Sequence, residues 1–131
     1  QISLVRTLDP THHINIGRAL QGLSLQNVLV IGSGFSFHNL KAFFAPDTAE
    51  SRQLNHAFEN WLMDVCSNRE YTEEKRGQML AAWSQAEGAR YCHPREEHLL
   101  PLHVCYGVAQ SPSSEQFDLM ILNKRSSMYV W

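Results

Sequence analysis

Residues 27–40 read NVLVIGSGFSFHNL, and this stretch decides the predicted fold. Asn27 to Ile31 is a short, uninterrupted apolar run, which is typical of a strand covered on both faces of a sheet. The Gly-Ser-Gly at residues 32–34 follows directly and predicts a turn, so that His38 and Asn39 lie at the strand's carboxyl end. Open α/β sheets place ligands at this edge. The sequence therefore predicts a candidate site around His38.

The residues before this stretch predict a strand and then a helix. Ile2 to Val5 read ISLV and indicate a strand. Asp9 and Pro10 supply a helix N-cap followed by proline at the first helical position, and the helix should run to about Leu20. Strand, helix and strand make a βαβ unit. We therefore expect an α/β fold with a mixed central sheet flanked by helices on both faces (α/β/α).

Two further helices are predicted from caps and apolar spacing. The first has Asp47 as N-cap with Glu50 three residues on, and the second has Thr72 as N-cap and ends before Gly88. The apolar stripe of the first consists of Leu54, Phe58, Trp61, Leu62 and Val65. Aromatic residues at helical spacing belong to a core far more often than to a cofactor site, so we expect this stripe to be buried.

The last third of the chain predicts one helix and two strands. The helix spans Cys92 to Val108, begins at His93-Pro94 and is kinked at Pro101. Phe117 to Leu122 and Ser127 to Trp131 are short apolar stretches that indicate strands.

Length and composition limit the class of protein. The 131 residues, 44% of them hydrophobic, suffice for one core, so residues 1–131 are a single domain or part of one. The net charge of −2 and the scattered basic residues exclude a nucleic-acid surface. There is neither an apolar run long enough to span a membrane nor a signal peptide pattern. Three cysteines without a Cys-x-x-Cys pair favour reduced thiols and a cytoplasmic location.

The seven histidines are not equivalent. His12 and His13 are neighbours on the first helix and are interpreted as surface or capping residues, and His56 is expected to be solvated. Three others, spaced five residues apart, are His93, His98 and His103. On one α-helix this spacing turns each side chain by about 140° from the last, so at most one of the three faces a site. Any further ligands must then come from elsewhere in the fold.

Several glycine motifs are excluded. Gly34 is not followed by the third glycine of a dinucleotide-binding fingerprint, and no Gly-Lys-Ser/Thr of a phosphate loop is present. A serine hydrolase elbow requires Gly-x-Ser-x-Gly, but Ile31 and Phe35 occupy the glycine positions around Ser33.

Two motifs carry a resemblance to a known family. VLVIGSGFSFHNL (Val28 to Leu40) and HPREEHLLPLHVCYGVA (His93 to Ala109) resemble the two C-terminal signatures of class III extradiol ring-cleavage dioxygenases, in the 4,5-DOPA dioxygenase-like branch. Weaker similarity runs through ISLVRTLDP, GRAL, FENWL and the last strand. The resemblance covers nearly the whole chain, and two motifs in the right order make it specific.

The resemblance implies a metal-dependent enzyme that cleaves a catechol-type ring with O2. The metal would be Fe(II), with Zn(II) as the alternative, and no organic cofactor is implied. His38 corresponds to the residue that acts as acid/base, which some members use as a metal ligand instead, and His98 corresponds to a protein ligand. Glu97, His93 and Asn39 would surround the metal without binding it: His93 would begin the helix, and Glu97 would orient an imidazole.

Family members are about twice as long, and their N-terminal half supplies two further metal histidines. We therefore expect this chain to be a C-terminal half that is inactive alone and needs the missing half or a companion chain. Two alternatives remain: a non-enzymatic interaction domain on the same fold, and a zinc hydrolase-like relative. The particular catechol and the position of ring cleavage, 4,5 or 2,3, are left open.

Overall fold

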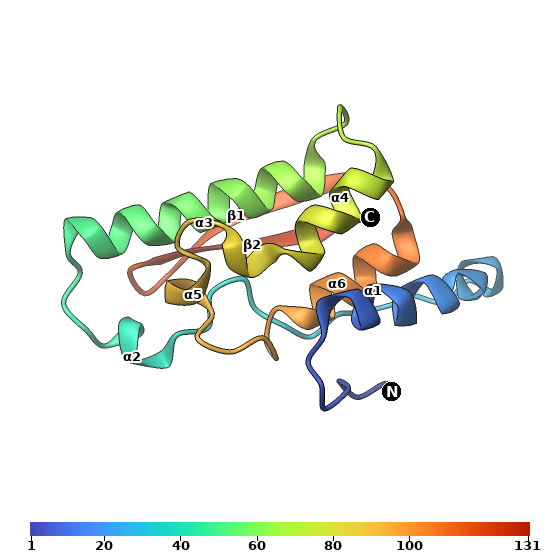
Figure 1. The fold of residues 1–131 in the computed structure, drawn as a ribbon, viewed down its shortest axis with the longest axis horizontal. Helices are drawn as coiled ribbons and strands as arrows, with labels where there is room; N and C mark the ends of the chain where they lie inside the picture. Colours follow the sequence, from blue (N-terminus) through green and yellow to red (C-terminus); the bar gives the residue numbers. More distant parts are fainter.

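The computed structural model describes residues 1–131, apart from the side chain of Ser24. A long helix lies along a two-stranded hairpin, and shorter helices pack beside it (Figure 1). The elements in chain order are α1 (Pro10–Ala19), the 3-10 helix η1 (Gln21–Gln26), α2 (Leu40–Phe43), α3 (Ala49–Ser67), α4 (Glu73–Ala81), the 3-10 helix η2 (Trp83–Gln85), α5 (Ala89–Cys92), α6 (Leu100–Ala109), β1 (Glu115–Ile121) and β2 (Lys124–Val130). None of the described helices is both long and apolar enough to cross a membrane.

The core forms where α3 meets β2, α4 and α5, and Tyr106 of α6 adds to it. Its largest buried apolar side chains are Phe37, Phe58, Leu62, Leu80, Trp83, Leu99, Leu100 and Tyr106. The predicted apolar stripe of α3 is confirmed, with Phe58, Leu62 and Val65 fully buried and Trp61 packed against them. All three cysteines are free, in agreement with the absence of a disulfide framework.

Helices α1 and α6 pack closely because glycines meet at their contact. A Cβ atom on Gly17 would lie 2.1 Å from the carbonyl oxygen of Val104, and one on Gly107 would lie 2.2 Å from that of Ile14. The predicted start of α1 is confirmed, since the Asp9 side chain accepts a hydrogen bond from the backbone N–H of His12 at 2.6 Å. The two glycine contacts, and not the cap, hold α1 against α6.

The two predicted C-terminal strands form an antiparallel hairpin. β1 pairs with β2 from Glu115 opposite Val130 to Ile121 opposite Lys124. Asn55 of α3 holds β2, because its side chain accepts from the Arg125 N–H at 2.7 Å and donates to the Arg125 carbonyl at 2.9 Å. The sheet therefore lies against α3 in a defined register.

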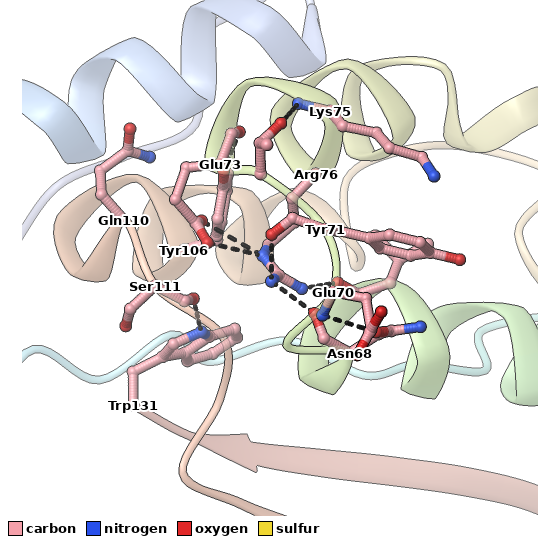
Figure 2. A network of polar contacts seen from close by, with 12 residues as sticks. Asn68, Glu70, Tyr71, Glu73, Lys75, Arg76, Tyr106, Gln110, Ser111 and Trp131 are labelled. Atoms are coloured by element: carbon pink, nitrogen blue, oxygen red, sulfur yellow. Dashed lines mark hydrogen bonds and ion pairs between the residues drawn. The ribbon is translucent and has the colours of Figure 1, made fainter.

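A buried arginine joins α3 to α4 (Figure 2). The Arg76 guanidinium donates to the carbonyl oxygens of Val65 and Asn68 at the end of α3, and it pairs with the Glu73 carboxylate at 3.2 Å. Tyr106 of α6 donates to the Glu73 carbonyl at 2.9 Å. The Arg76 bonds satisfy carbonyls that the end of α3 leaves free.

The predicted strands at residues 2–5 and 27–31 are not formed in the structure. Among the described residues the sheet contains β1 and β2 alone, so a mixed central sheet flanked on both faces is not observed. A strand needs a neighbour to pair with, and none of the described segments pairs with these two. Leu29 and Ile31, expected to be buried, are 81% and 78% exposed.

The predicted turn at Gly32 to Gly34 is also wrong, and the glycines have a different reason. A Cβ atom on Gly32 would lie 2.7 Å from the Cys105 sulfur, and one on Gly34 would lie 2.5 Å from the carbonyl oxygen of His98. The glycines let this segment run directly against the start of α6.

Three helix boundaries differ from the predictions. α3 is capped by Thr48, whose hydroxyl accepts from the Ser51 N–H, and not by Asp47, which pairs with Lys124 at 3.0 Å. Residues 92–108 do not form one kinked helix: α5 ends at Cys92, and Pro101 lies in the first turn of α6. Proline is favoured there because the first helical N–H groups have no intrahelical partner. The cap of α4 at Thr72 is confirmed, but α4 ends at Ala81 and does not continue as far as the predicted stop at Gly88.

Candidate functional site

His38 and His98 lie face to face. Their imidazole rings stack with centroids 3.4 Å apart and an angle of 22° between their planes. Both side chains are partly exposed, so the pair lies at the surface of the structure and can be reached from solvent. The structure therefore brings together the two histidines that the sequence ranked highest.

Backbone and side-chain hydrogen bonds hold the segment that carries His38 against residues 91–98. Phe35 N–H donates to the His98 carbonyl at 2.9 Å, and His38 N–H donates to the Cys92 carbonyl at 2.9 Å. Asn39 caps α2 by accepting from Ala42 N–H and also donates its amide to the Tyr91 carbonyl at 2.7 Å. Asn39 thus supports the position of His38.

His93 is a buried support for the same segment. Its Nε2 lies 2.6 Å from the Ser36 carbonyl oxygen and must donate, because a carbonyl can only accept. Burial lowers the pKa of His93 to about 4, so the ring is neutral at pH 7. The prediction that His93 begins a helix is wrong, because His93 is the C-cap of α5.

The pKa of His38 is subject to opposing effects from its neighbours. Burial lowers the pKa of His38, and the adjacent His98 lowers it further, while Glu97 raises it. The Glu97 carboxylate itself pairs with Arg95 at 3.3 Å. Glu97 therefore acts on His38 through its charge. It forms its ion pair with Arg95, and not with an imidazole that it was expected to orient.

The remaining histidines lie outside this pair. His103 is buried on α6, where its Nε2 donates to the Leu80 carbonyl at 2.9 Å, so its predicted place away from the His38 crevice is confirmed. His56 is exposed, as expected. His12 is exposed too, but His13 is fully buried and accepts from Val5 N–H at 3.2 Å, so the surface interpretation of His13 is wrong.

The described residues do not complete a metal site. No group of three or more histidine, cysteine, aspartate or glutamate side chains is arranged to hold an ion. The lone pair of an imidazole nitrogen lies in the plane of its ring, and the planes of His38 and His98 are nearly parallel and 3.4 Å apart. An ion in the plane of one ring would therefore lie well outside the plane of the other. The two histidines do not fit one metal ion in this arrangement.

A groove of about 660 Å³ opens beside His98. One wall is the segment of residues 28–36, and the others come from α6 and β2. Its lining residues include the apolar Leu102, Val108 and Val130 together with Ser127 and Tyr129 of β2. Small-molecule sites commonly combine apolar walls with a few polar groups in this way.

Sequence reasoning missed a buried carboxyl group, Glu59, on the inner face of α3. Its side chain is 0% exposed, and burial raises its pKa to about 7. Ser127 donates its hydroxyl to Glu59 Oε2 at 2.6 Å, whereas Glu59 Oε1 has no hydrogen-bond partner. The sequence did contain a signal for this buried group. Asn55 and Glu59 stand among the apolar residues that form the inner face of α3, such as Phe58 and Leu62. A polar residue in such a place is buried and requires hydrogen-bond partners.

Comparisons with known proteins find relatives along most of this chain. It is 37% identical over 122 residues to 4,5-DOPA dioxygenase extradiol of Portulaca grandiflora, which covers 88% of this chain and 41% of that protein. It is 35% identical over 121 residues to Dioxygenase tasH of Hapsidospora irregularis, which covers 83% of this chain and 36% of that protein. The 4,5-DOPA dioxygenase extradiol of Beta vulgaris is 33% identical over 116 residues, with 88% and 41% covered. No protein-family model matches. The chain thus spans about two fifths of the length of these relatives.

Proposed function

We propose, from the premise that this chain is related to the C-terminal part of the 4,5-DOPA extradiol dioxygenases, that it forms part of an extradiol dioxygenase. The substrate class would be a catechol-type aromatic, cleaved with O2. The observation that carries the proposal is the stacking of His38 on His98, since each residue comes from one of the two family signatures. The apolar groove beside His98 suits the uncharged body of an aromatic ring.

In this proposal His38 is the acid/base and His98 a metal ligand. His38 is held by its backbone N–H and by Asn39, which leaves its ring nitrogens free to exchange a proton with a substrate hydroxyl group. His93 and Asn39 position this segment, and Glu97 adds negative charge next to it.

In this proposal the present chain supplies only part of the metal site. Fe(II) is the first choice and Zn(II) the second, and His98 supplies a single ligand. The other ligands would come from the rest of the complete enzyme or from a companion chain, and the 131 residues alone would then be inactive. Exposed apolar side chains at Leu29 and Ile31 support such a contact.

The test is the origin of the oxygen atoms in the product. The complete enzyme, loaded with Fe(II) and given a catechol under ¹⁸O₂, should incorporate both labelled atoms into the ring-opened product. Label from H2¹⁸O alone would identify the zinc hydrolase-like alternative. Absence of any product with either metal would favour the non-enzymatic interaction domain.

A further inference from the structure

Glu59 is the centre of a buried polar network that joins α3, β2 and the His38 segment. Ser127 of β2 donates its hydroxyl to Glu59 Oε2 at 2.6 Å and lies 2.7 Å from the Tyr129 hydroxyl. The Ser127 backbone N–H in turn donates to Ser36 Oγ at 2.7 Å, so Ser127 links the Glu59 carboxyl group to Ser36. Ser36 and Ser127 are 4% and 8% exposed, so the network is shielded from water.

Ser36 is held at two points. Its Oγ accepts from the Ser127 N–H at 2.7 Å, and its carbonyl accepts from His93 Nε2 at 2.6 Å. The chain reaches His38 two residues later. The segment between belongs to no helix or strand, so its place depends on these contacts together with the bond from His38 N–H to the Cys92 carbonyl.

Burying a carboxyl group at this position carries a large desolvation cost in free energy. A leucine of similar volume would avoid the desolvation cost and would add apolar burial. A polar residue is useful here because its partners must adopt one arrangement to be satisfied, which gives a unique geometry. Catalytic groups need such support, since a displacement of about 1 Å can cost about 10²-fold in rate.

We infer that Glu59, acting through Ser127 and Ser36, is a positioning residue for His38. This inference rests on the proposed role of His38. Glu59 does not reach substrate; it fixes Ser127, whose N–H holds the hydroxyl of Ser36, and Ser36 lies on the backbone that leads to the stacked imidazole.

The test measures the position of His38 directly. Stacking on His98 displaces the NMR signals of the His38 ring protons, and that displacement can be followed in the 131-residue chain. Glu59→Leu should abolish the displacement, because it removes the acceptor of the Ser127 hydroxyl, and the Ser127 N–H is what holds Ser36 Oγ. Glu59→Gln keeps a hydrogen-bonding group of the same shape and should preserve it. In the complete enzyme, Glu59→Leu should lower kcat by about 10²-fold with little change in KM.

Asn55→Leu is the matched control. Asn55 is also buried on α3 and also bonds β2, through the Arg125 backbone, and it does not contact Ser36. Its one other contact is a long one, 3.9 Å to the Cys92 sulfur, which is too weak to hold the Cys92 carbonyl in place for His38. The substitution should lower the free energy of unfolding and leave the His38 signals in place. Loss of the displacement in both leucine variants would mean general loosening and would overturn the inference.

Two further results separate the inference from the proposed function. If Glu59→Leu does not fold, Ser36→Ala decides, because it removes only the hydroxyl group; unmoved His38 signals there, or in a folded Glu59→Leu, overturn the inference. If instead His38→Ala retains full turnover, the proposed function fails while the NMR result still stands or falls on its own.

Discussion

Gly34 lies directly against the backbone of His98: a Cβ atom on Gly34 would come within 2.5 Å of the His98 carbonyl oxygen. The adjacent Phe35 N–H donates to that same oxygen at 2.9 Å. The close approach of these two segments is what allows the imidazoles of His38 and His98 to stack.

Gly34→Ala should therefore separate the two segments. We expect a loss of about 1–3 kcal/mol in the free energy of unfolding, measured by urea denaturation, because an added methyl group meets backbone that cannot move aside cheaply. Gly22→Ala is the control, since a Cβ there has nothing within 4 Å and should change stability by less than about 0.5 kcal/mol. Equal effects of both substitutions would contradict the steric explanation.

The two histidines should differ in what they lose. In the complete enzyme, His98→Ala should remove bound metal, measured by elemental analysis. His38→Ala should retain the metal and lower turnover by about 10²- to 10⁴-fold, the usual contribution of a general acid or base. His56→Ala, at an exposed histidine that is not part of the pair, serves as the control. Full turnover in both variants would end the proposed assignment.

Glu59 should make stability depend on pH between about 4.5 and 7. Its pKa is about 7 in the folded chain against an ordinary value of 4.5, so the folded state keeps a proton that the unfolded state releases. Its contribution is present below pH 4.5 and is lost as the pH rises to 7, by about 3 kcal/mol in total. Glu59→Gln should remove this loss, measured as the difference in unfolding free energy between pH 5 and pH 8.

The comparison with wild type is needed because His93 acts in the opposite direction. Its pKa of about 4 means that the unfolded state takes up a proton first as the pH falls below its ordinary value of 6.5, which destabilises the fold. His93 is present in both proteins, so its effect cancels in the difference. An identical pH dependence in wild type and Glu59→Gln would show that Glu59 is ionised in the folded chain.

Arg76→Ala should be among the most destabilising substitutions outside the site. It leaves the carbonyls of Val65 and Asn68 without a donor in a buried place and opens a cavity, at a cost of about 3 kcal/mol. Thermal and urea unfolding would measure it. Arg69→Ala, at an exposed position nearby, should stay within about 0.5 kcal/mol of wild type. A small effect at Arg76 would mean that water replaces its bonds.

Short-range features could be read from the sequence. The caps at Asp9 and Thr72, the apolar face of α3 and the two C-terminal strands depend on residues within a few positions of one another, and all are present in the structure. The family resemblance, which the comparisons confirm, likewise rests on motifs contiguous in sequence. The sequence by itself thus determined where α1 and α4 begin and which face of α3 is buried, and it singled out the two histidines that the structure brings together.

The tertiary structure alone decided how distant segments meet. An apolar run such as residues 27–31 has strand propensity, but pairing requires a neighbouring strand, and no described segment provides one. The glycines at 32 and 34 indicated a turn from the sequence alone. In the structure they are needed because the start of α6 lies directly against them. The burial of Glu59 depends on Ser36 and Ser127, which lie 23 residues before it and 68 residues after it. Packing, desolvation and ring stacking act between groups that the chain brings together from far apart, and local spacing carries no record of them.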